Sequence, residues 1–198
     1  MFETLITAFS GPGAAFMYAI TAALAFGLAV MFERCWMFWV RWKLNEPDIH
    51  QQLTSNDYPA AISSAGLHPV GNIIRAGAPT NDADSAWDAM ATESALAENT
   101  VRRRVGWLST ISNIATMLGL LGTVYGLILA FSGLEQASAV ERTARLSSGI
   151  GTAMATTAWG LLVGIPAMAA HALLEGRVAR ILASCEAIAA RLALSKRS

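Results

Sequence analysis

The sequence predicts an all-α membrane protein with three transmembrane helices and long cytoplasmic helical extensions. Composition is the first observation: 54% of the 198 residues are hydrophobic and only 14% are charged, whereas soluble domains carry about 25% charged residues. The second observation is position. Three windows, 4–32, 105–134 and 146–174, contain no Asp, Glu, Lys or Arg. Each is longer than the roughly 20 apolar residues that span a bilayer.

The first span is expected over 13–40, preceded at 1–12 by an amphipathic helix along the outer membrane surface. Apolar residues at 2, 5, 6 and 9 have the spacing of such a helix. No basic segment precedes the first span, so it is expected to be retained and not cleaved as a signal peptide. Glu33 stands beside Arg34 near the inner end of the span, which favours a local ion pair over proton transfer.

The segment 41–104 is polar, and its prolines suit the first turns of short helices. We expect helices at about 58–66 and 69–77. Asp82 or Asp84 then offers an N-cap, and one unbroken helix is expected from about 84 to 131. The remaining segments are expected to be a second span at 105–133, a short periplasmic connection at 134–146, a third span at 147–173 and a helical cytoplasmic tail at 174–198.

Charge distribution predicts the orientation. Apart from Arg142 and Arg145, every Lys and Arg lies in the 34–104 segment or after the third span. Because basic loops stay in the cytoplasm, the N-terminus is expected outside and the C-terminus inside. The residues expected at the membrane interface are three tryptophans and an arginine run, which also contacts lipid phosphate: Trp36, Trp39, Trp42, Arg102, Arg103 and Arg104.

Several function classes have no support in the sequence. The net charge is zero, so nucleic acid is not an expected partner. Cys35 and Cys185 fall on the reducing side, and the three histidines show no metal-ligand spacing. There is no nucleophile–base pair and no phosphate-binding loop after a strand. We therefore expect no enzyme, no metal and no cofactor.

The second and third spans each carry a face of small residues. Such faces let membrane helices approach closely, and helix packing is the simpler explanation. The glycines of these faces are Gly119, Gly122, Gly126, Gly149, Gly160 and Gly164. The same faces also carry hydroxyls, which can bond their own helix or line a pore. These candidates for a pore or proton pathway are Thr116, Thr123, Thr152, Thr156 and Thr157.

Two stretches carry a family resemblance. LLGTVYGLILAF at 120–131 and GIGTAMATTAWGLLVGIP at 149–166 resemble the second and third spans of the MotA/TolQ/ExbB proton-channel family, and the ExbB and TolQ branch in particular. HPVGNIIRAG at 68–77 resembles a motif of that family's cytoplasmic loop. The order of spans and loops is also similar, and the resemblance covers nearly the whole chain.

The resemblance implies a bacterial inner-membrane protein that assembles as a pentamer around a central pore. The pore would enclose the single-span helices of an ExbD- or TolR-like partner, whose membrane aspartate carries the proton. That implication agrees with the lack of Asp, Glu, Lys and Arg in the three windows, since proton relays in membranes use ionisable groups. Thr123 and Thr157 match two family threonines that line the pore near the aspartate.

The sequence departs from the family pattern at two positions. Thr152 stands where ExbB and TolQ carry a glutamate, and Thr116 replaces a proline. The expected function is a subunit of a proton-driven, stator-like motor complex that does mechanical work on the cell envelope. The missing glutamate gives weight to a motility or gliding motor subunit of the same family. A non-conducting membrane scaffold is the alternative from a different class.

Overall fold

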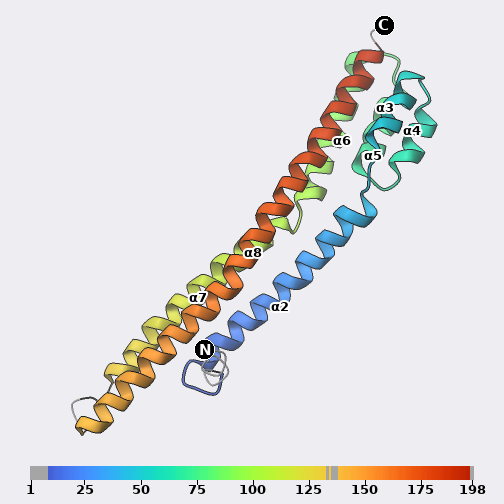
Figure 1. Cartoon of the computed structure of the whole chain (residues 1–198). Helices are drawn as coiled ribbons and strands as arrows, with labels where there is room; N and C mark the ends of the chain where they lie inside the picture. The colour runs from blue at the N-terminus through green and yellow to red at the C-terminus, as the bar shows by residue number, and fades with distance from the viewer. Residues whose placement is uncertain (1–8, 133, 135–137, 197–198) are drawn as a thin grey trace. The chain divides into compact units, whose positions relative to one another are not determined.

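The computed structural model describes residues 9–132, 134 and 138–196, and these residues form helices joined by short turns (Figure 1). Three stretches are long and apolar enough to cross a membrane: Ala14–Arg41, Ala83–Phe131 and Ala139–Ser195. The all-helical class and the three long apolar helices expected from the sequence are therefore confirmed. The amphipathic helix predicted at 1–12 falls largely outside the described residues.

The chain divides into two compact units. The first comprises residues up to Met31 together with Gly106–His171, and the second comprises Phe32–Val105 together with Ala172–Ser198. In the first unit, α2 (Ala14–Trp36) contributes its N-terminal part, and α7 (Val105–Phe131) and the first half of α8 (Ala139–Ser195) supply the rest. The second unit contains the other helices and the second half of α8.

In the first unit, α2 packs on the other two helices through a small apolar centre. Ile20, Ala115 and Val163 are buried there, one from each helix. One hydrogen bond and one aromatic contact add to this packing. Trp159 Nε1 donates a hydrogen bond to Thr21 Oγ1 at 3.1 Å, and the Phe26 and Trp107 rings meet edge to face at 6.0 Å.

The second unit contains short helices that begin where local signals start them. They are α3 (Glu46–Thr54), α4 (Tyr58–Ala65) and α5 (Pro69–Gly77), each with a proline in its first turn. Prolines suit that position because its N–H has no helical partner. The helices predicted at 58–66 and 69–77 are confirmed, whereas α3 was not predicted.

Longer-range packing in this unit uses large apolar side chains. Ile73 and Ile74 of α5 and Met90 of α6 (Ala83–Arg102) are fully buried. Leu192 of α8 is also fully buried, and its side chain lies 3.0 Å from where a Cβ on Gly77 would stand. Asp82 caps α6 by accepting a hydrogen bond from Ser85 N at 2.9 Å, so Asp82 is the N-cap.

The predicted continuous helix from 84 to 131 is wrong. α6 ends at Arg102 and α7 begins at Val105, because Arg104 adopts a left-handed backbone with φ of 70°. This conformation is unfavourable for a residue with a Cβ. Arg104 also forms an ion pair with Glu33, which pairs with Arg34 at 4.0 Å. The predicted local ion pair of Glu33 is confirmed, and Arg104 is an additional partner.

α8 is one helix from Ala139 to Ser195. It therefore begins inside the segment 134–146 that was expected to be a connection, and it runs without a break into the predicted tail. Ser138 starts it with a reciprocal cap, since its hydroxyl and backbone N–H donate to Glu141 and Glu141 N donates back to its hydroxyl. Serine and glutamate at this spacing form a capping box.

Candidate functional site

The six glycines of the small faces lie where α7 and α8 touch. A Cβ on Gly119 would stand 3.2 Å from Gly160 Cα, and a Cβ on Gly160 would stand 2.7 Å from Ala115 O. Toward the other end of the same contact, a Cβ on Gly126 would stand 2.8 Å from Gly149 O. Backbone meets backbone along this line, so even a methyl group would not fit.

Hydrogen bonds from Ser112 and Thr157 join α7 and α8. Ser112 Oγ donates to Gly164 O at 2.7 Å, and Thr157 Oγ1 donates to Gly119 O at 3.2 Å. Each bond reaches a carbonyl that the close approach of the backbones brings within range. Thr157 therefore lies at the contact between α7 and α8, and its side chain is only partly exposed.

The other four threonines donate to carbonyls of their own helix. The distances are 2.9 Å from Thr116 to Ser112 O, 2.6 Å from Thr123 to Leu120 O and 3.0 Å from Thr152 to Ser148 O. Thr156 Oγ1 lies 3.1 Å from Thr152 O and 3.0 Å from Ala153 O. A hydroxyl that donates in this way still has lone pairs with which to accept a hydrogen bond.

Burial distinguishes Thr156 from the other four threonines. Thr156 is fully buried, with its Cβ 2.5 Å from where a Cβ on Gly122 would stand. Thr152 Cγ2 lies 2.7 Å from the corresponding point on Gly13, just before α2. Thr156 therefore packs inside the protomer, whereas Thr152 touches Gly13 and is still partly exposed. Thr116 is exposed, and Thr123 and Thr157 are partly exposed like Thr152, so these four remain reachable from outside.

Sequence reasoning missed the contribution of α2 to this packing. Thr21 accepts from Trp159 Nε1 and itself donates to Met17 O at 2.8 Å. Gly13 provides the space for Thr152 and Thr156. None of these residues belongs to a repeated small face, so no periodic signal marks them. Only the pairing of α2 with α8 gives them a role.

The residues predicted for the membrane interface differ from one another. Trp36 is 65% exposed and Trp39 is 48% exposed, as side chains in contact with lipid headgroups would be. Trp42 differs from both, because it is only 8% exposed and packs edge to face on His68 and against Phe38. A π-helical segment, Met37–Arg41, precedes it. Trp42 is a core residue of the second unit.

Two of the three arginines in the 102–104 run have carboxylate partners. Arg102 Nε pairs with Glu98 at 2.8 Å and also forms an ion pair with Glu175 of α8, while Arg104 pairs with Glu33. Exposed pairs of this kind add little stability individually. They do fix the direction of the side chains, so Arg102 and Arg104 join segments of the second unit.

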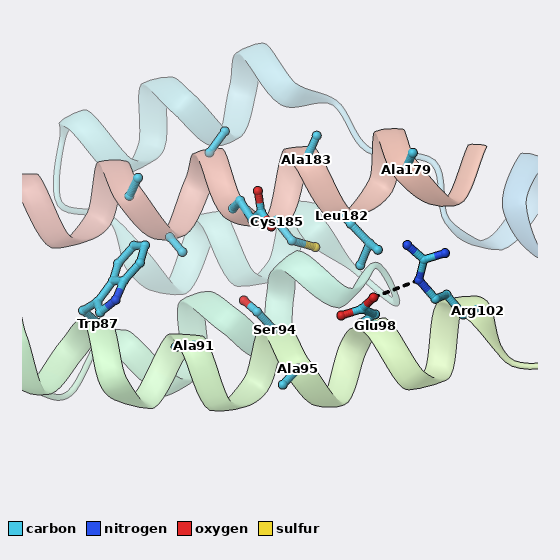
Figure 2. Close-up of a pocket in the computed structure, with 14 residues that line it drawn as sticks. Trp87, Ala91, Ser94, Ala95, Glu98, Arg102, Ala179, Leu182, Ala183 and Cys185 are labelled. Atoms are coloured by element: carbon cyan, nitrogen blue, oxygen red, sulfur yellow. Dashed lines mark hydrogen bonds and ion pairs between the residues drawn. The ribbon is translucent and has the colours of Figure 1, made fainter. Parts of the chain in front are cut away.

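A groove of about 1020 Å³ lies between α6 and α8 in the second unit (Figure 2). Figure 2 shows Trp87, Ser94, Glu98 and Arg102 along α6, with Leu182 and Cys185 of α8 between the two helices, and several alanines of α8 also line the groove. Trp87 is 45% exposed. Cys185 lines the groove, and burial together with the Glu186 charge raises the pKa of its thiol to about 12, so it stays protonated and inert.

The model of the MotA/TolQ/ExbB proton channel family matches residues 58–187. Residues 58–187 include α4 to α7 and α8 as far as residue 187. They also contain all five threonines and all six glycines discussed above.

Curated relatives include both branches named above. The chain is 43% identical over 79 residues to Biopolymer transport protein exbB1 of Vibrio cholerae, covering 40% of this chain and 35% of the relative. It is 32% identical over 167 residues to Putative biopolymer transport protein ExbB-like 1 of Synechocystis, covering 79% and 65%. It is 37% identical over 79 residues to Tol-Pal system protein TolQ of Haemophilus influenzae, covering 39% and 34%. The chain thus spans between a third and two thirds of the length of these relatives.

Among solved structures, the "Structure of C. jejuni MotAB" matches with a TM-score of 0.45 and 14% sequence identity. The match covers 96% of this chain and 75% of that chain. A score at this level does not establish a common fold, so the relationship rests on the family model and the curated relatives.

Proposed function

Because the chain belongs to the MotA/TolQ/ExbB proton channel family, we propose that it is a subunit of a proton-driven motor complex in a bacterial inner membrane. The family is one of proton channels and not of enzymes. In this proposal the complex converts the proton motive force into mechanical work on the cell envelope. One proton crossing the membrane supplies about 2.3 kcal/mol per 100 mV.

The observation that carries the proposal is the combination of family membership with three apolar windows free of Asp, Glu, Lys and Arg. A proton pathway in a membrane needs an ionisable group, and these windows offer no carboxylate. We therefore propose a single-span, ExbD- or TolR-like partner that carries a membrane aspartate. The partner helix would lie against the faces of α7 and α8 that remain open in one protomer.

Thr123 and Thr157 are the proposed contacts for that aspartate. Both are partly exposed, and each uses its hydroxyl proton in a bond to a backbone carbonyl. Their lone pairs can then accept a hydrogen bond from a protonated carboxyl group. Thr116 is the outlying member of the pathway. Thr156 was also a candidate from the sequence, and its burial within the protomer favours a packing role instead. Thr152 is partly exposed and stays a proposed member of the pathway.

We also propose that copies of the chain assemble into a ring, with a pentamer as the expected number. The groove between α6 and α8 supports this, because it combines an exposed Trp87 with an alanine-rich floor (Figure 2). An aromatic side chain beside a shallow apolar surface is typical of a protein contact. The proposed orientation places the N-terminus in the periplasm and the C-terminus in the cytoplasm. The reason is that most basic residues lie in the 34–104 segment and after the third span, and basic segments stay in the cytoplasm.

Proton flux through reconstituted protein tests the proposal. The chain and its single-span partner are incorporated into vesicles, and flux is measured for the unmodified protein, Thr157→Ala and Thr157→Val. We expect both variants to lower the flux by about tenfold, the effect of losing one hydrogen bond. Unchanged flux in both would remove Thr157 from the pathway. Thr156→Val is not a suitable control, because the Thr156 hydroxyl donates to carbonyls of its own helix in a buried position. Thr110→Val is the control, since Thr110 is exposed and does not belong to the small face of α7.

A non-conducting scaffold is the second candidate. The specific observation in its favour is that all five candidate threonines already donate to backbone carbonyls inside one protomer. A scaffold would show no flux with any single-span partner while still forming the same assembly. A motility or gliding motor subunit would conduct with its own partner, so the identity of the partner that restores flux separates these branches.

A further inference from the structure

A polar cavity of about 360 Å³ lies in the second unit, where the chain leaves α2 and meets the second half of α8. It shares the lining residue Ala183 with the groove between α6 and α8, and none of the five threonines lines it. Its lining combines apolar side chains with polar side chains from three parts of the chain. The lining residues are Trp42, Leu44, Glu46, His68, Arg177, Arg180, Ile181, Ala183 and Ser184.

Arg177 lines this cavity, and one of its N–H groups has no hydrogen-bond acceptor among the described residues. Its Nε is buried, and no described residue accepts a hydrogen bond from it. Its guanidinium lies over the Trp39 ring at 5.8 Å from the centroid, which holds the group in place by a cation–π contact. A buried N–H without an acceptor is costly. Because the guanidinium is planar and fixed, it is suited to an oxygen anion that supplies the missing acceptor.

Arg180, three residues further along α8, adds a second guanidinium. One of its five N–H groups, Nε–H, donates to Gly176 O at 3.3 Å. Arginine side chains arranged as a pair bind phosphate oxygens through parallel charge-assisted hydrogen bonds. Two guanidinium groups that line one cavity therefore indicate an anion with several oxygens.

His68 supplies a neutral donor. Its Nδ1 accepts a hydrogen bond from Val70 N at 3.2 Å at the start of α5, so in the neutral ring the proton resides on Nε2. Burial, and then the nearby Arg177 charge, lower the pKa of His68 to about 4. The imidazole is therefore uncharged near neutral pH, and it can donate through Nε2 without adding a charge.

Glu46 sets the net charge of the cavity. Its carboxylate accepts a hydrogen bond from Ser184 Oγ at 2.5 Å, and it lines the cavity together with the two arginines. Two guanidinium groups and one carboxylate leave one uncompensated positive charge. A phosphodiester carries a single negative charge, so it matches this surplus better than a phosphate dianion does.

The cavity lies just beyond the predicted ends of the first and third spans, and this position indicates where a phosphodiester in it would come from. Trp42 follows the predicted end of the first span at 40, and Arg177 lies four residues after the predicted end of the third span at 173. At 1.5 Å per helical residue, Arg177 is about 6 Å beyond the apolar region, where lipid headgroups lie. The exposed Trp36 and Trp39 belong to the same level.

We propose that this cavity binds a phosphate-bearing anion through Arg177 and Arg180, and that in the membrane its occupant is the phosphodiester of an anionic phospholipid. The site would tie the junction between spans and cytoplasmic helices to the inner leaflet. The proposal is independent of proton conduction, because neither arginine belongs to the threonine pathway. It holds equally for a motor subunit and for a scaffold.

Lipid retention by the purified full chain tests the site. The protein in neutral detergent is mixed with phosphatidylglycerol, with diacylglycerol as the lipid without phosphate, or with inorganic phosphate, and the bound ligand is measured. We expect retention of phosphatidylglycerol but not of diacylglycerol. Arg177→Gln and Arg180→Gln should each weaken it about tenfold, the effect of removing a charge-assisted hydrogen bond. Arg191→Gln is the matched control, because it removes the same charge from an exposed position on the same helix.

Glu46→Gln provides a test of opposite sign. Removing the opposing carboxylate should strengthen retention several-fold, a gain that loss of folding cannot produce. Unchanged retention in Arg177→Gln and Arg180→Gln, or an equal loss in Arg191→Gln, would overturn the proposal. A changed assembly mass in Arg177→Gln with unchanged retention would also overturn it, and would assign the cavity to a contact between copies. Binding of inorganic phosphate without retention of phosphatidylglycerol would support an anion site and would identify soluble phosphate, not lipid, as its ligand.

Discussion

The two units of this chain hold helices together in different ways. In the first unit, α7 and α8 meet backbone to backbone at Gly119, Gly126, Gly149 and Gly160, and hydroxyls donate to carbonyls. In the second unit, large side chains such as Ile73 fill the space between helices. The difference follows the surroundings expected for each unit. Lipid offers no hydrophobic drive for association, so close contact must stabilise the helices, whereas water drives apolar side chains together.

Truncating a buried side chain of the second unit is expected to have the largest effect. Ile73→Ala removes a fully buried side chain, so the free energy of unfolding should fall by about 2–5 kcal/mol. Ile128→Ala in α7 is the matched change in the first unit, where the side chain is 61% exposed and expected to face lipid. Denaturant unfolding in detergent should show almost no change for Ile128→Ala. Equal losses for the two variants would contradict the comparison.

Acid is expected to destabilise the second unit through His68. Its pKa is about 4 in the folded protein, below the ordinary value of 6.5. The unfolded chain therefore binds a proton that the folded chain does not, and the free energy of unfolding falls as the pH drops from 6.5 towards 4. The full loss is about 3 kcal/mol, and it is absent above pH 6.5.

His68→Asn isolates this effect, because asparagine is a good N-cap that does not titrate. The variant should keep α5 and lose this part of the pH dependence, as followed by unfolding at several pH values. A variant that retains the full acid sensitivity of the unmodified protein would show that other groups cause it.

A single methyl group should disrupt the contact between α7 and α8. In Gly149→Ala the new Cβ would stand 2.5 Å from Ala130 Cβ and 2.6 Å from Gly126 O. Overpacking of this kind lowers stability by about 1–3 kcal/mol. Gly151→Ala is the control on the same helix, since nothing lies within 4 Å of its Cβ position. Thermal unfolding should separate the two variants, and similar melting temperatures would disprove backbone-to-backbone packing at this point.

The smallest effect is expected at Gly66, where conformation and not space matters. Gly66 ends α4 with φ of 56° and ψ of −117°, and nothing lies within 4 Å of its Cβ position. Gly66→Ala should lower the free energy of unfolding by about 1–2 kcal/mol through backbone strain alone. The same measurement on Gly151→Ala, which is helical and equally open, should give no loss. An unchanged free energy of unfolding in Gly66→Ala would show that the turn relaxes to accommodate the methyl group.

Much of the site could be predicted from the sequence because its signals are periodic. The small faces of α7 and α8 repeat with the helical period, and the two faces pack on each other in the structure. Periodicity could not separate Thr156, buried inside the protomer, from the partly exposed Thr123 and Thr157. All three lie on the same broad faces, and the difference depends on which neighbour each meets.

The sequence by itself determined the three apolar helices, the distribution of basic residues and the starts of α4, α5 and α6. These features depend on transfer of apolar residues into lipid, on loop charge and on local capping, all of which act within a few neighbouring residues. Only the tertiary structure decided the break at Arg104, the burial of Trp42 and the cavity that joins Glu46, His68 and Arg177. Those features depend on contacts between segments far apart in the chain, and such contacts leave no periodic pattern in any one segment.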